Sequence, residues 1–392
     1  MLESQEPALD VENAVRRRYS LGAKGVQADL CCPTTYDPKY LDVIPQEILE
    51  RDYGCGDPSR HLREGETVLD LGFGAGKVCF IASQIVGPFG KVIGVDMNDD
   101  MLSVARRNAP EVARRIGYSN VDFRKGKIQD LALDLEALEL WLNAHPVRSA
   151  GDLSATEAYI EDIRANRPLV ASDSMDVVVS NCVLNLVKPL AKEQLFSEIY
   201  RVLRRGGRAV ISDIVSDEEV PRHLQEDPAL WSGCISGALR EDKFLQAFED
   251  AGFYGISILE RQHEAWRTVE GIEFRSVTVA AYKGKEGVCR DLKQAVIYKG
   301  PFKQVVDDDG HVLRRGMRVA VCEKTFSIYS REPYACHFEF VEPLVPPSEE
   351  QVQPFPCTSG MLVRDPRETK GQDYRLTTEP KPFSCGPNGG CC

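Results

Sequence analysis

The stretch at residues 67–77 reads Thr-Val-Leu-Asp-Leu-Gly-Phe-Gly-Ala-Gly-Lys, and it decides the fold. Its first half, residues 68–71, is a short apolar run of the kind that forms a buried strand, and three alternate glycines follow it. The apolar residues 78–86 then predict a buried helix, and residues 91–96 predict a second strand. A strand, a helix and a strand with short connections form a βαβ unit, so the glycine loop lies between a strand end and a helix start.

The chain on either side continues this pattern. Because its strand segments are apolar without alternation, we expect strands that are covered on both faces, as in a parallel sheet. Residues 131–170 interrupt the pattern, and the sequence Ser-Ala-Thr-Glu at 154–157 predicts a capping box that opens a helix in this insertion. Further strands are predicted at 121–123, 175–180, 208–212, 256–260 and 276–282, and helices at 10–19, 101–108 and 191–205.

Changes in composition divide the chain into five parts. The alternation of predicted strands and helices indicates the α/β fold class, and a smaller β-rich domain follows at the C-terminal side. We expect a lead segment at 1–62 with a cysteine pair, a cofactor-binding α/β domain at 63–215, an excursion with closing strands at 216–284, a small β-rich domain at 285–345 and a flexible cysteine-containing tail at 346–392.

Charge and hydropathy exclude several classes of partner. The 392 residues include 48 Lys and Arg against 60 Asp and Glu, which gives a net charge of −12. An acidic chain disfavours nonspecific binding to nucleic acid or to an anionic membrane. No apolar run is long enough for a membrane helix, and the start lacks the pattern of a signal peptide, so we expect a cytoplasmic protein. In that reducing compartment the 13 cysteines are expected to be thiols rather than a disulfide scaffold.

The spacing of the glycine loop separates two kinds of nucleotide cofactor. The dinucleotide fingerprint counted from Gly72 requires Gly or Ala where Lys77 stands. The observed pattern of an acid followed by three alternate glycines resembles motif I of class I S-adenosylmethionine methyltransferases. Asp96, an acid at the end of the second strand, could accept hydrogen bonds from both hydroxyls of a ribose. Met97 beside it is a candidate for packing on adenine. The cofactor residues of the motif itself are Asp70, Gly72, Gly74 and Gly76.

Three cysteines lie in distinctive surroundings, although no C-x-x-C metal motif occurs. Cys55 stands between two glycines after Tyr53. Cys182 follows the fourth predicted strand in Ser-Asn-Cys-Val-Leu-Asn-Leu-Val, at the edge where an open parallel sheet binds ligands. Cys234 lies in the excursion, in Leu-Trp-Ser-Gly-Cys-Ile-Ser-Gly-Ala-Leu.

These contexts, together with the Gly-Gly-Cys-Cys end of the chain, resemble the arsenite S-adenosylmethionine methyltransferases. The resemblance implies a class I methyltransferase sheet of Rossmann-like type and an arsenic-binding excursion. It implies four functional cysteines, of which Cys182 and Cys234 hold trivalent arsenic. The other two functional cysteines implied are Cys32 and Cys55, and Cys55 is also a third arsenic ligand. The resemblance places Tyr53 near the reacting site, and it implies cofactor contacts for Asn181, Ile128 and Gln129.

The chemistry of arsenic fits such a site. Trivalent arsenic is soft and exchanges hydroxide for thiolate, and its lone pair can attack a sulfonium methyl in line without a general base. Cys31 and Cys32 are adjacent, and Cys32 is preferred because of the Pro-Thr-Thr that follows it. Gly233 stands where relatives often carry an acid, which removes one candidate for assisting departure of an arsenic-bound hydroxyl.

The resemblance also implies partners and a reduction step. The substrate would be arsenite or its thiol conjugates, and a disulfide between Cys32 and Cys55 would be reduced by thioredoxin or glutathione. We expect a monomer. Two alternatives remain open: a methyltransferase for another small acceptor such as a selenium compound, and a thiol-rich protein that sequesters metalloids. The other cysteines are not among these four. Cys79 is expected to pack in the core, and Cys289, Cys322, Cys336 and Cys357 share no spacing. For Cys385, Cys391 and Cys392 two interpretations stay open: capture of arsenic or other soft metals that are then passed inward, or a mobile tail.

Overall fold

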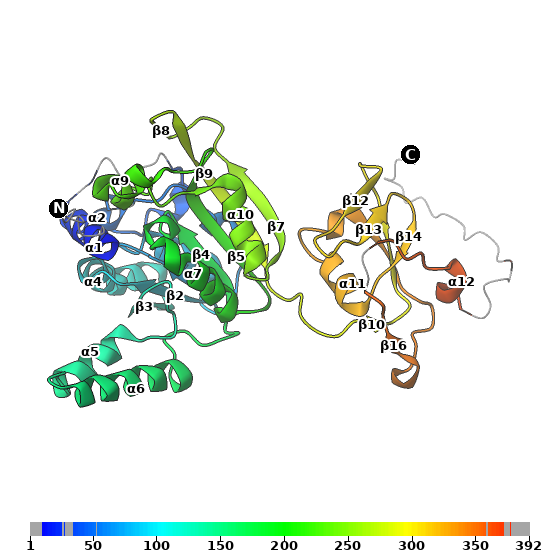
Figure 1. Cartoon of the computed structure of the whole chain (residues 1–392), viewed down its shortest axis with the longest axis horizontal. Helices are drawn as coiled ribbons and strands as arrows, with labels where there is room; N and C mark the ends of the chain where they lie inside the picture. The colour runs from blue at the N-terminus through cyan, green and yellow to red at the C-terminus, as the bar shows by residue number, and fades with distance from the viewer. Residues whose placement is uncertain are drawn as a thin grey trace, which may run out of the picture. The chain divides into compact units, whose positions relative to one another are not determined.

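The structure is a computed structural model, and it describes residues 10–25, 27, 34–51, 53–357, 360–371 and 377. The chain divides into two compact units, one that ends at Gly284 and one that begins at Lys285 (Figure 1). This division falls at the expected boundary between the excursion with its closing strands and the small β-rich domain.

A mostly parallel sheet forms the centre of the first unit. Its strands are β1 (Thr67–Leu71), β2 (Lys91–Asp96), β3 (Val121–Lys125), β4 (Met175–Asn181), β5 (Leu203–Ser216), β6 (Leu239–Arg240), β7 (Tyr254–Arg261), β8 (Arg267–Val269) and β9 (Ile272–Tyr282). The order is β3-β2-β1-β4-β5-β9-β7, while β6 pairs with β5 and β8 pairs with β9. Strands β1 to β5 are parallel to one another, β9 pairs antiparallel with β5, and β7 pairs antiparallel with β9. The predicted α/β class and the predicted pairing of the two closing strands are confirmed.

Helices cover both faces of this sheet. The helices are α1 (Val11–Gly22), α2 (Gln46–Leu49), α3 (Lys77–Val86), α4 (Asp99–Ile116), α7 (Pro189–Val202), α8 (Arg222–Gln225), α9 (Pro228–Ser232) and α10 (Glu241–Asp250), with short 3-10 turns η2 (Pro38–Tyr40), η3 (Pro58–His61) and η4 (Leu184–Leu186). In β1, Val68 packs in the core with α3 and α4, whereas Leu69 packs in the core with α7 and α10. Successive side chains of a strand point to opposite faces, so a strand buried on both faces reads as a continuous apolar run.

The insertion is helical, as predicted, but its second helix begins earlier than the sequence suggested. It forms α5 (Leu135–Ala144) and α6 (Ala150–Asn166), which stand clear of the sheet (Figure 1). The N-cap is Ser149, whose hydroxyl accepts the Asp152 N–H at 3.2 Å, and the expected box at Ser154 lies inside the helix. The same Ser-x-x-acid pattern occurs five residues earlier in the chain, and the local pattern alone does not choose between them.

The helix and strand around the Gly206-Gly207 pair also differ from the prediction. The helix ends at Val202, and Leu203 already pairs with Met175 of β4. Strand β5 therefore includes the two glycines and runs on to Ser216. A glycine pair after an amphipathic segment favours a helix stop, but here the two glycines lie in an irregular stretch of strand between two pairing registers.

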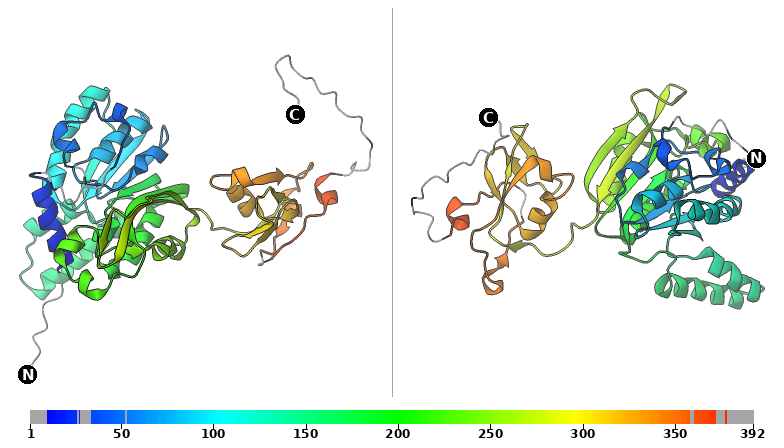
Figure 2. Two further views of the ribbon diagram at one scale, coloured as in Figure 1. Left: turned by 90° about the horizontal axis from the view of Figure 1, so that it is seen from above. Right: turned by 180° about the vertical axis from the view of Figure 1, so that it is seen from behind.

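The second unit is small and rich in strands. It contains β10 (Arg290–Asp291), β11 (Ala295–Tyr298), β12 (Gln304–Val306), β13 (Val312–Arg314), β14 (Arg318–Ala320), β15 (Phe338–Val341) and β16 (Gln353–Pro354), with α11 (Glu323–Tyr329), α12 (Pro366–Thr369), η5 (Ala335–His337) and η6 (Glu349–Gln351). Its main sheet has the order β14-β11-β15. The chain enters this unit from β9 through one connection (Figure 2).

The prediction of a flexible tail from residue 346 is wrong for residues 346–357 and 360–371. Strand β16 pairs with β10, and Val363 bridges to Val319 of β14. Arg364 is only 5% exposed, and its guanidinium donates to Asp291 at 2.6 Å. The prediction was wrong because a Pro-rich, charged composition is typical of flexible segments and does not indicate such long-range contacts. The cysteines at 385, 391 and 392 lie outside the described residues.

Within the described part of the chain, none of the helices has the length and apolar character that crossing a bilayer requires.

Candidate active site

The glycine loop joins β1 to α3 in the predicted way. Gly72, Gly74 and Gly76 all have positive φ, at 66°, 56° and 93°. A Cβ on Gly72 would come within 2.3 Å of Val183, which follows β4, so this position requires glycine on steric grounds as well. A Cβ on Gly74 would meet no atom within 4 Å, and Gly74 lines a cavity. The loop thus presents bare backbone to an open space.

Asp96 ends β2 beside this loop. Its carboxylate accepts the Gly74 N–H at 3.0 Å and the Asn98 N–H at 2.8 Å. Burial raises the pKa of Asp96 to about 6. Each carboxylate oxygen keeps a further lone pair, so the group could still accept from a ribose diol.

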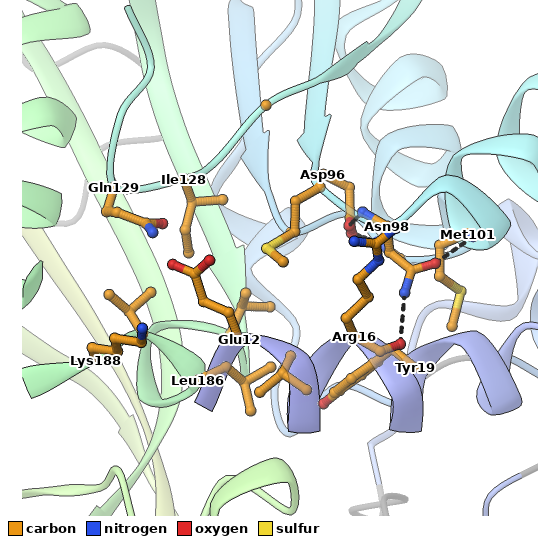
Figure 3. A pocket seen from close by; sticks show the side chains of 17 residues that line it. Glu12, Arg16, Tyr19, Asp96, Asn98, Met101, Ile128, Gln129, Leu186 and Lys188 are labelled. Carbon is orange, nitrogen blue, oxygen red and sulfur yellow. Dashed lines mark hydrogen bonds between the residues drawn. The ribbon is translucent and has the colours of Figure 1, made fainter. Parts of the chain in front are cut away.

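The cavity at Asp96 is lined by the residues expected for adenosine. Met97, Ile128 and Gln129, the residues expected at adenine, all line it, and Figure 3 labels the last two. Its walls combine apolar side chains with two carboxylates, those of Glu12 and Asp96, and two cations, those of Arg16 and Lys188. The apolar part suits an adenine ring, and the strand-end carboxylate suits its ribose. The residues present therefore fit S-adenosylmethionine.

Helix α1 closes one side of this cavity, and sequence reasoning missed its part. Glu12, Arg16 and Tyr19 of α1 face Asp96 and Gln129 across the cavity (Figure 3). Asn98 holds the helix by donating to the Arg16 carbonyl at 3.1 Å. The predicted helix at 10–19 carried no glycine or motif that would have marked it as part of a binding site.

A second cavity leads from the glycine loop to the cysteines. It shares Tyr19, Gly72 and Gly74 with the first cavity, and it is also lined by Asn181 and Cys182. Further lining residues are Asp70, Tyr53 and Lys77. Two adjoining cavities thus connect the adenosine side of the loop with the end of β4.

Asp70 and Lys77 are both engaged by neighbouring side chains. The Cys79 thiol donates to the Asp70 carboxylate at 3.1 Å, so Cys79 packs in the core as expected. Burial, and then the charge of Asp70, raise the pKa of Cys79 well above its usual value. The Lys77 ammonium lies 3.9 Å from the centre of the Tyr36 ring.

Cys182 and Cys234 share an unusual backbone conformation. Cys182 has φ of 63° and Cys234 has φ of 62°, in the left-handed region that few residues other than glycine adopt. The Cys182 N–H donates to the Ser212 carbonyl at 2.8 Å, which fixes the turn after β4. The Cys234 thiol donates to the Cys182 carbonyl at 3.1 Å. The excursion therefore brings Cys234 against the end of β4.

Cys55 completes the cluster from the lead segment. Its Sγ, the Cys182 Sγ and a carboxylate oxygen of Asp213 lie within 4.8 Å of one another, and all three residues are buried. Cys55, Cys182 and Cys234 belong to one packed cluster. The structure thus brings together three of the four cysteines chosen from the sequence, while Cys32 lies outside the described residues.

Asn181 positions the Cys55 loop. Its carbonyl oxygen accepts the N–H groups of Cys55 at 2.8 Å and Gly56 at 3.1 Å. Its amide nitrogen donates to the Gly56 carbonyl at 2.8 Å and to the Tyr36 hydroxyl at 3.0 Å. A contact with the cofactor stays a prediction for Asn181, and these four bonds show that it also joins β4 to the lead segment.

Asp213 and Lys192 place two opposite charges in the core beside the thiols. Burial raises the pKa of Asp213 to about 6 and lowers the pKa of Lys192 to about 8. The Asp213 carboxylate accepts the Leu184 N–H at 2.9 Å. Sequence reasoning noted that Gly233 supplies no carboxylate but did not find Asp213, which directly follows the predicted strand at 208–212 and could have been read as a strand-end acid.

Two tyrosines border the cysteines. The Tyr53 hydroxyl donates to the Gly22 carbonyl at 3.1 Å, so Tyr53 ties the end of α1 to the Cys55 loop. Its role in the reaction stays a prediction. The Tyr19 hydroxyl lies 3.9 Å from the Cys234 Sγ. Burial, and then the charges of Cys234 and Cys182, raise the pKa of Tyr19 well above its usual value, so Tyr19 remains protonated and able to donate.

Comparison with known proteins places this site in a family. A methyltransferase domain model matches residues 62–156 and 144–252, and a domain of unknown function matches residues 285–374. An arsenite methyltransferase of Aquipseudomonas alcaligenes is 32% identical over 81% of this chain and 86% of its own length. The human arsenite methyltransferase is 28% identical over 92% of this chain and 90% of its own length.

A solved structure extends the likeness to the fold. The crystal structure of an arsenic(III) S-adenosylmethionine methyltransferase from Chlamydomonas reinhardtii is 28% identical, with a TM-score of 0.53 over 81% of this chain and 99% of that chain. With a relative that is 32% identical over 86% of its own length, the chain belongs to the arsenite methyltransferase family.

Proposed function

We propose that this protein transfers methyl groups from S-adenosylmethionine to trivalent arsenic held by its cysteine thiolates. One observation carries the proposal: Cys55, Cys182 and Cys234 converge from three distant segments beside a cavity that adjoins the glycine loop. Thiolates are soft ligands, and a buried group of them suits a soft ion that exchanges oxygen for sulfur.

The cofactor would lie along the two adjoining cavities. Asp96 would hold the ribose, Met97, Ile128 and Gln129 would pack on the adenine, and the bare backbone of the glycine loop would accommodate the amino-acid part. S-adenosylmethionine supplies an activated methyl group on a sulfonium sulfur.

The thiols would hold the arsenic with its lone pair directed away from the sulfur ligands. Binding replaces arsenic–oxygen bonds by arsenic–sulfur bonds, and each thiol proton leaves with hydroxide as water. The burial of the cysteines excludes solvent and fixes the distance to the methyl group, and positioning of this kind is a large contribution to rate. Tyr19 and Asp213 lie beside these thiols and could donate a proton to a departing hydroxide.

Electron balance then requires two reducing equivalents. When the arsenic lone pair forms the bond to carbon, the bond from the methyl group to the sulfonium sulfur breaks, S-adenosylhomocysteine is released and arsenic gives up two electrons. Two thiols that close to a disulfide return these electrons and release two protons, and one arsenic–sulfur bond breaks, so that arsenic is again trivalent with three bonds. We propose Cys32 and Cys55 for this step. The disulfide would be reduced by thioredoxin or glutathione through thiol exchange. We further propose that the substrate arrives as a thiol conjugate and that the enzyme works as a monomer in the cytoplasm.

Methyl transfer to arsenite, compared with transfer to selenite, tests the proposal. Reduced protein is incubated with labelled S-adenosylmethionine, a monothiol and one acceptor, and the products are separated by mass. We expect methylated arsenicals from the wild type and none from Cys182→Ser or Cys234→Ser. Transfer to selenite alone, retained in both variants, would replace the proposal by a methyltransferase for another acceptor. Arsenite binding without any binding of S-adenosylmethionine in equilibrium dialysis would replace it by a sequestering protein.

A further inference from the structure

The second unit contains a cluster of three cysteines that the first site does not use. The Sγ atoms of Cys289, Cys322 and Cys357 lie within 4.8 Å of one another. In the sequence these cysteines share no spacing that would mark them as a site. The fold brings them together from the start of β10, the start of α11 and the segment after β16.

Backbone pairing holds this cluster in place. Strand β10 pairs with β16, and beside that pair the Phe355 N–H donates to the Cys289 carbonyl at 2.8 Å. The Cys357 N–H donates to the Phe355 carbonyl at 2.9 Å. Cys322 packs with Phe355 and Ala320 in a small core, against which Cys289 also packs. The three thiols are therefore fixed by the structure of this unit.

The cluster is open to solvent on one side. Cys322 is fully buried, Cys289 is half-buried and Cys357 is exposed. An ion could thus enter past Cys357 and be held against Cys322. Cys336, in the same unit, is exposed and does not belong to the cluster, which makes it a matched control.

Polar contacts hold the buried member of the cluster. The Cys322 Sγ accepts the Thr325 N–H at 3.4 Å and lies 3.2 Å from the Thr325 hydroxyl. Both groups belong to α11, so the first turn of this helix holds the sulfur in place.

The number of ligands indicates which ion fits. Among the described residues the group has three members, all of them sulfur, and no His, Asp or Glu joins them. A structural zinc site is closed by four ligands at about 2.3 Å for sulfur. Trivalent arsenic forms three bonds in a pyramid and keeps a lone pair in the fourth position, so three thiols are enough to complete its coordination.

We propose that Cys289, Cys322 and Cys357 form a second binding site for trivalent arsenic, separate from the methyl-transfer site. Arsenite would exchange three arsenic–oxygen bonds for three arsenic–sulfur bonds, the three thiol protons would leave with the hydroxides as three waters, and arsenic would stay trivalent. This proposal goes beyond methyl transfer and rests on the geometry of the second unit alone.

Arsenic content after gel filtration tests the second site. The full chain carrying Cys182→Ser and Cys234→Ser is the background, so that binding at the proposed methylation site does not contribute. Reduced protein is incubated with arsenite and excess monothiol and separated, and bound arsenic per chain is measured by mass spectrometry. Cys289→Ser, Cys357→Ser and Cys336→Ser are added one at a time. The first two replace half-buried or exposed thiols, and thermal melts check that they stay folded.

We expect the background protein to bind one arsenic fewer per chain when it also carries Cys289→Ser or Cys357→Ser. With Cys336→Ser the bound arsenic per chain should stay unchanged. Equal arsenic content in all of these proteins would overturn the proposal. So would a protein that is purified with one zinc per chain, loses that zinc with Cys357→Ser and takes up no arsenic at the cluster. Because the background has lost the proposed methylation site, a wild type that fails to methylate arsenite would count against the proposed function without changing this result.

Discussion

Cys182 and Cys234 each adopt a left-handed backbone that costs conformational energy. Such strain persists where the surrounding structure fixes it, and it gathers at functional sites. Here the Ser212 carbonyl holds the turn at Cys182, and the Cys234 thiol donates to the Cys182 carbonyl. The surrounding hydrogen bonds thus hold both cysteines in this strained conformation and keep them next to each other. This arrangement supports their assignment as arsenic ligands.

Replacement of either cysteine tests this assignment. We expect Cys182→Ser or Cys234→Ser to lower arsenite methylation by about 100-fold or more, because serine is a hard ligand that holds trivalent arsenic poorly. The affinity for S-adenosylmethionine, measured by calorimetry, should stay within about twofold of the wild type, because neither cysteine lines the cavity at Asp96 and serine is close to cysteine in size. Cys336→Ser is the control. Variants that keep the wild-type rate would remove these cysteines from the mechanism.

Asp213 predicts a dependence of stability on pH. Burial raises its pKa from 3.8 to about 6, so its contribution to stability is fully present below the unfolded value and is lost as the pH rises through about 6. Asp213→Asn keeps a neutral group at this position. Relative to the wild type, we expect the free energy of unfolding of the variant to rise by about 1 kcal/mol between about pH 5 and about pH 7.

Urea unfolding of both proteins at the two pH values provides the measurement. Lys192 loses its partner in the variant, which lowers the pKa of this lysine further below about 8. A lysine with a lowered pKa makes stability rise with pH, so this effect adds to the gain of the variant. A difference between variant and wild type that does not change with pH would contradict a buried carboxyl at this position.

The loop before η3 shows how an element positions a ligand. A Cβ on Gly54 would approach the Asn181 amide nitrogen to 2.2 Å. Asn181 cannot move away cheaply, because four hydrogen bonds tie it to Cys55, Gly56 and Tyr36. The small residue beside Cys55 thus lets the loop pack tightly on β4.

Gly54→Ala tests the fit of this loop. We expect arsenite methylation to fall by about tenfold or more, because a shift of the order of 1 Å in a reacting group is costly. Gly151→Ala in α6 is the matched control, since its nearest neighbour would lie at 3.6 Å, and it should keep the wild-type rate. Initial rates and thermal melts of both variants decide the matter. Equal rates in the two variants would show that the Cys55 loop does not position the substrate.

Features that depend on a short sequence pattern could be predicted from the sequence. Features that depend on packing between distant segments could not. The βαβ unit, Asp96 and the cysteine after β4 follow from apolar runs and strand ends, and the structure places them as expected. The start of α6 was missed because two Ser-x-x-acid patterns compete. Helix α1 as a cavity wall, Asp213 and the three cysteines of the second unit depend on packing between segments far apart in the chain, which a single sequence does not display.

At the scale of the whole molecule, the chain is two units with one link. Lys283 still belongs to the first unit and binds Asp173 at 2.8 Å, whereas Lys285 binds Asp309 of the second at 2.7 Å. Between these residues and β10 the chain has no regular secondary structure, and Val288 is 78% exposed. Exposed links of this kind are preferred sites of proteolysis.

Limited proteolysis tests this division. Glu286 is exposed in the link, so we expect a glutamate-specific protease to cut there early and to release two fragments that resist further digestion. Intact mass identifies the cut. First cuts within β1–β5, or a link that outlasts both units, would contradict two independently compact units.

A single-turnover experiment on the reduced full-length protein tests methyl transfer to arsenic most directly. Enzyme, a stoichiometric amount of arsenite and methyl-labelled S-adenosylmethionine are mixed with a monothiol and quenched at intervals, and S-adenosylhomocysteine and arsenic species are counted in each sample. The account predicts that each S-adenosylhomocysteine appears together with one new arsenic–carbon bond, and that neither appears with Cys182→Ser. Formation of S-adenosylhomocysteine without methylated arsenic, or methylated arsenic at the wild-type rate in Cys182→Ser, would contradict it.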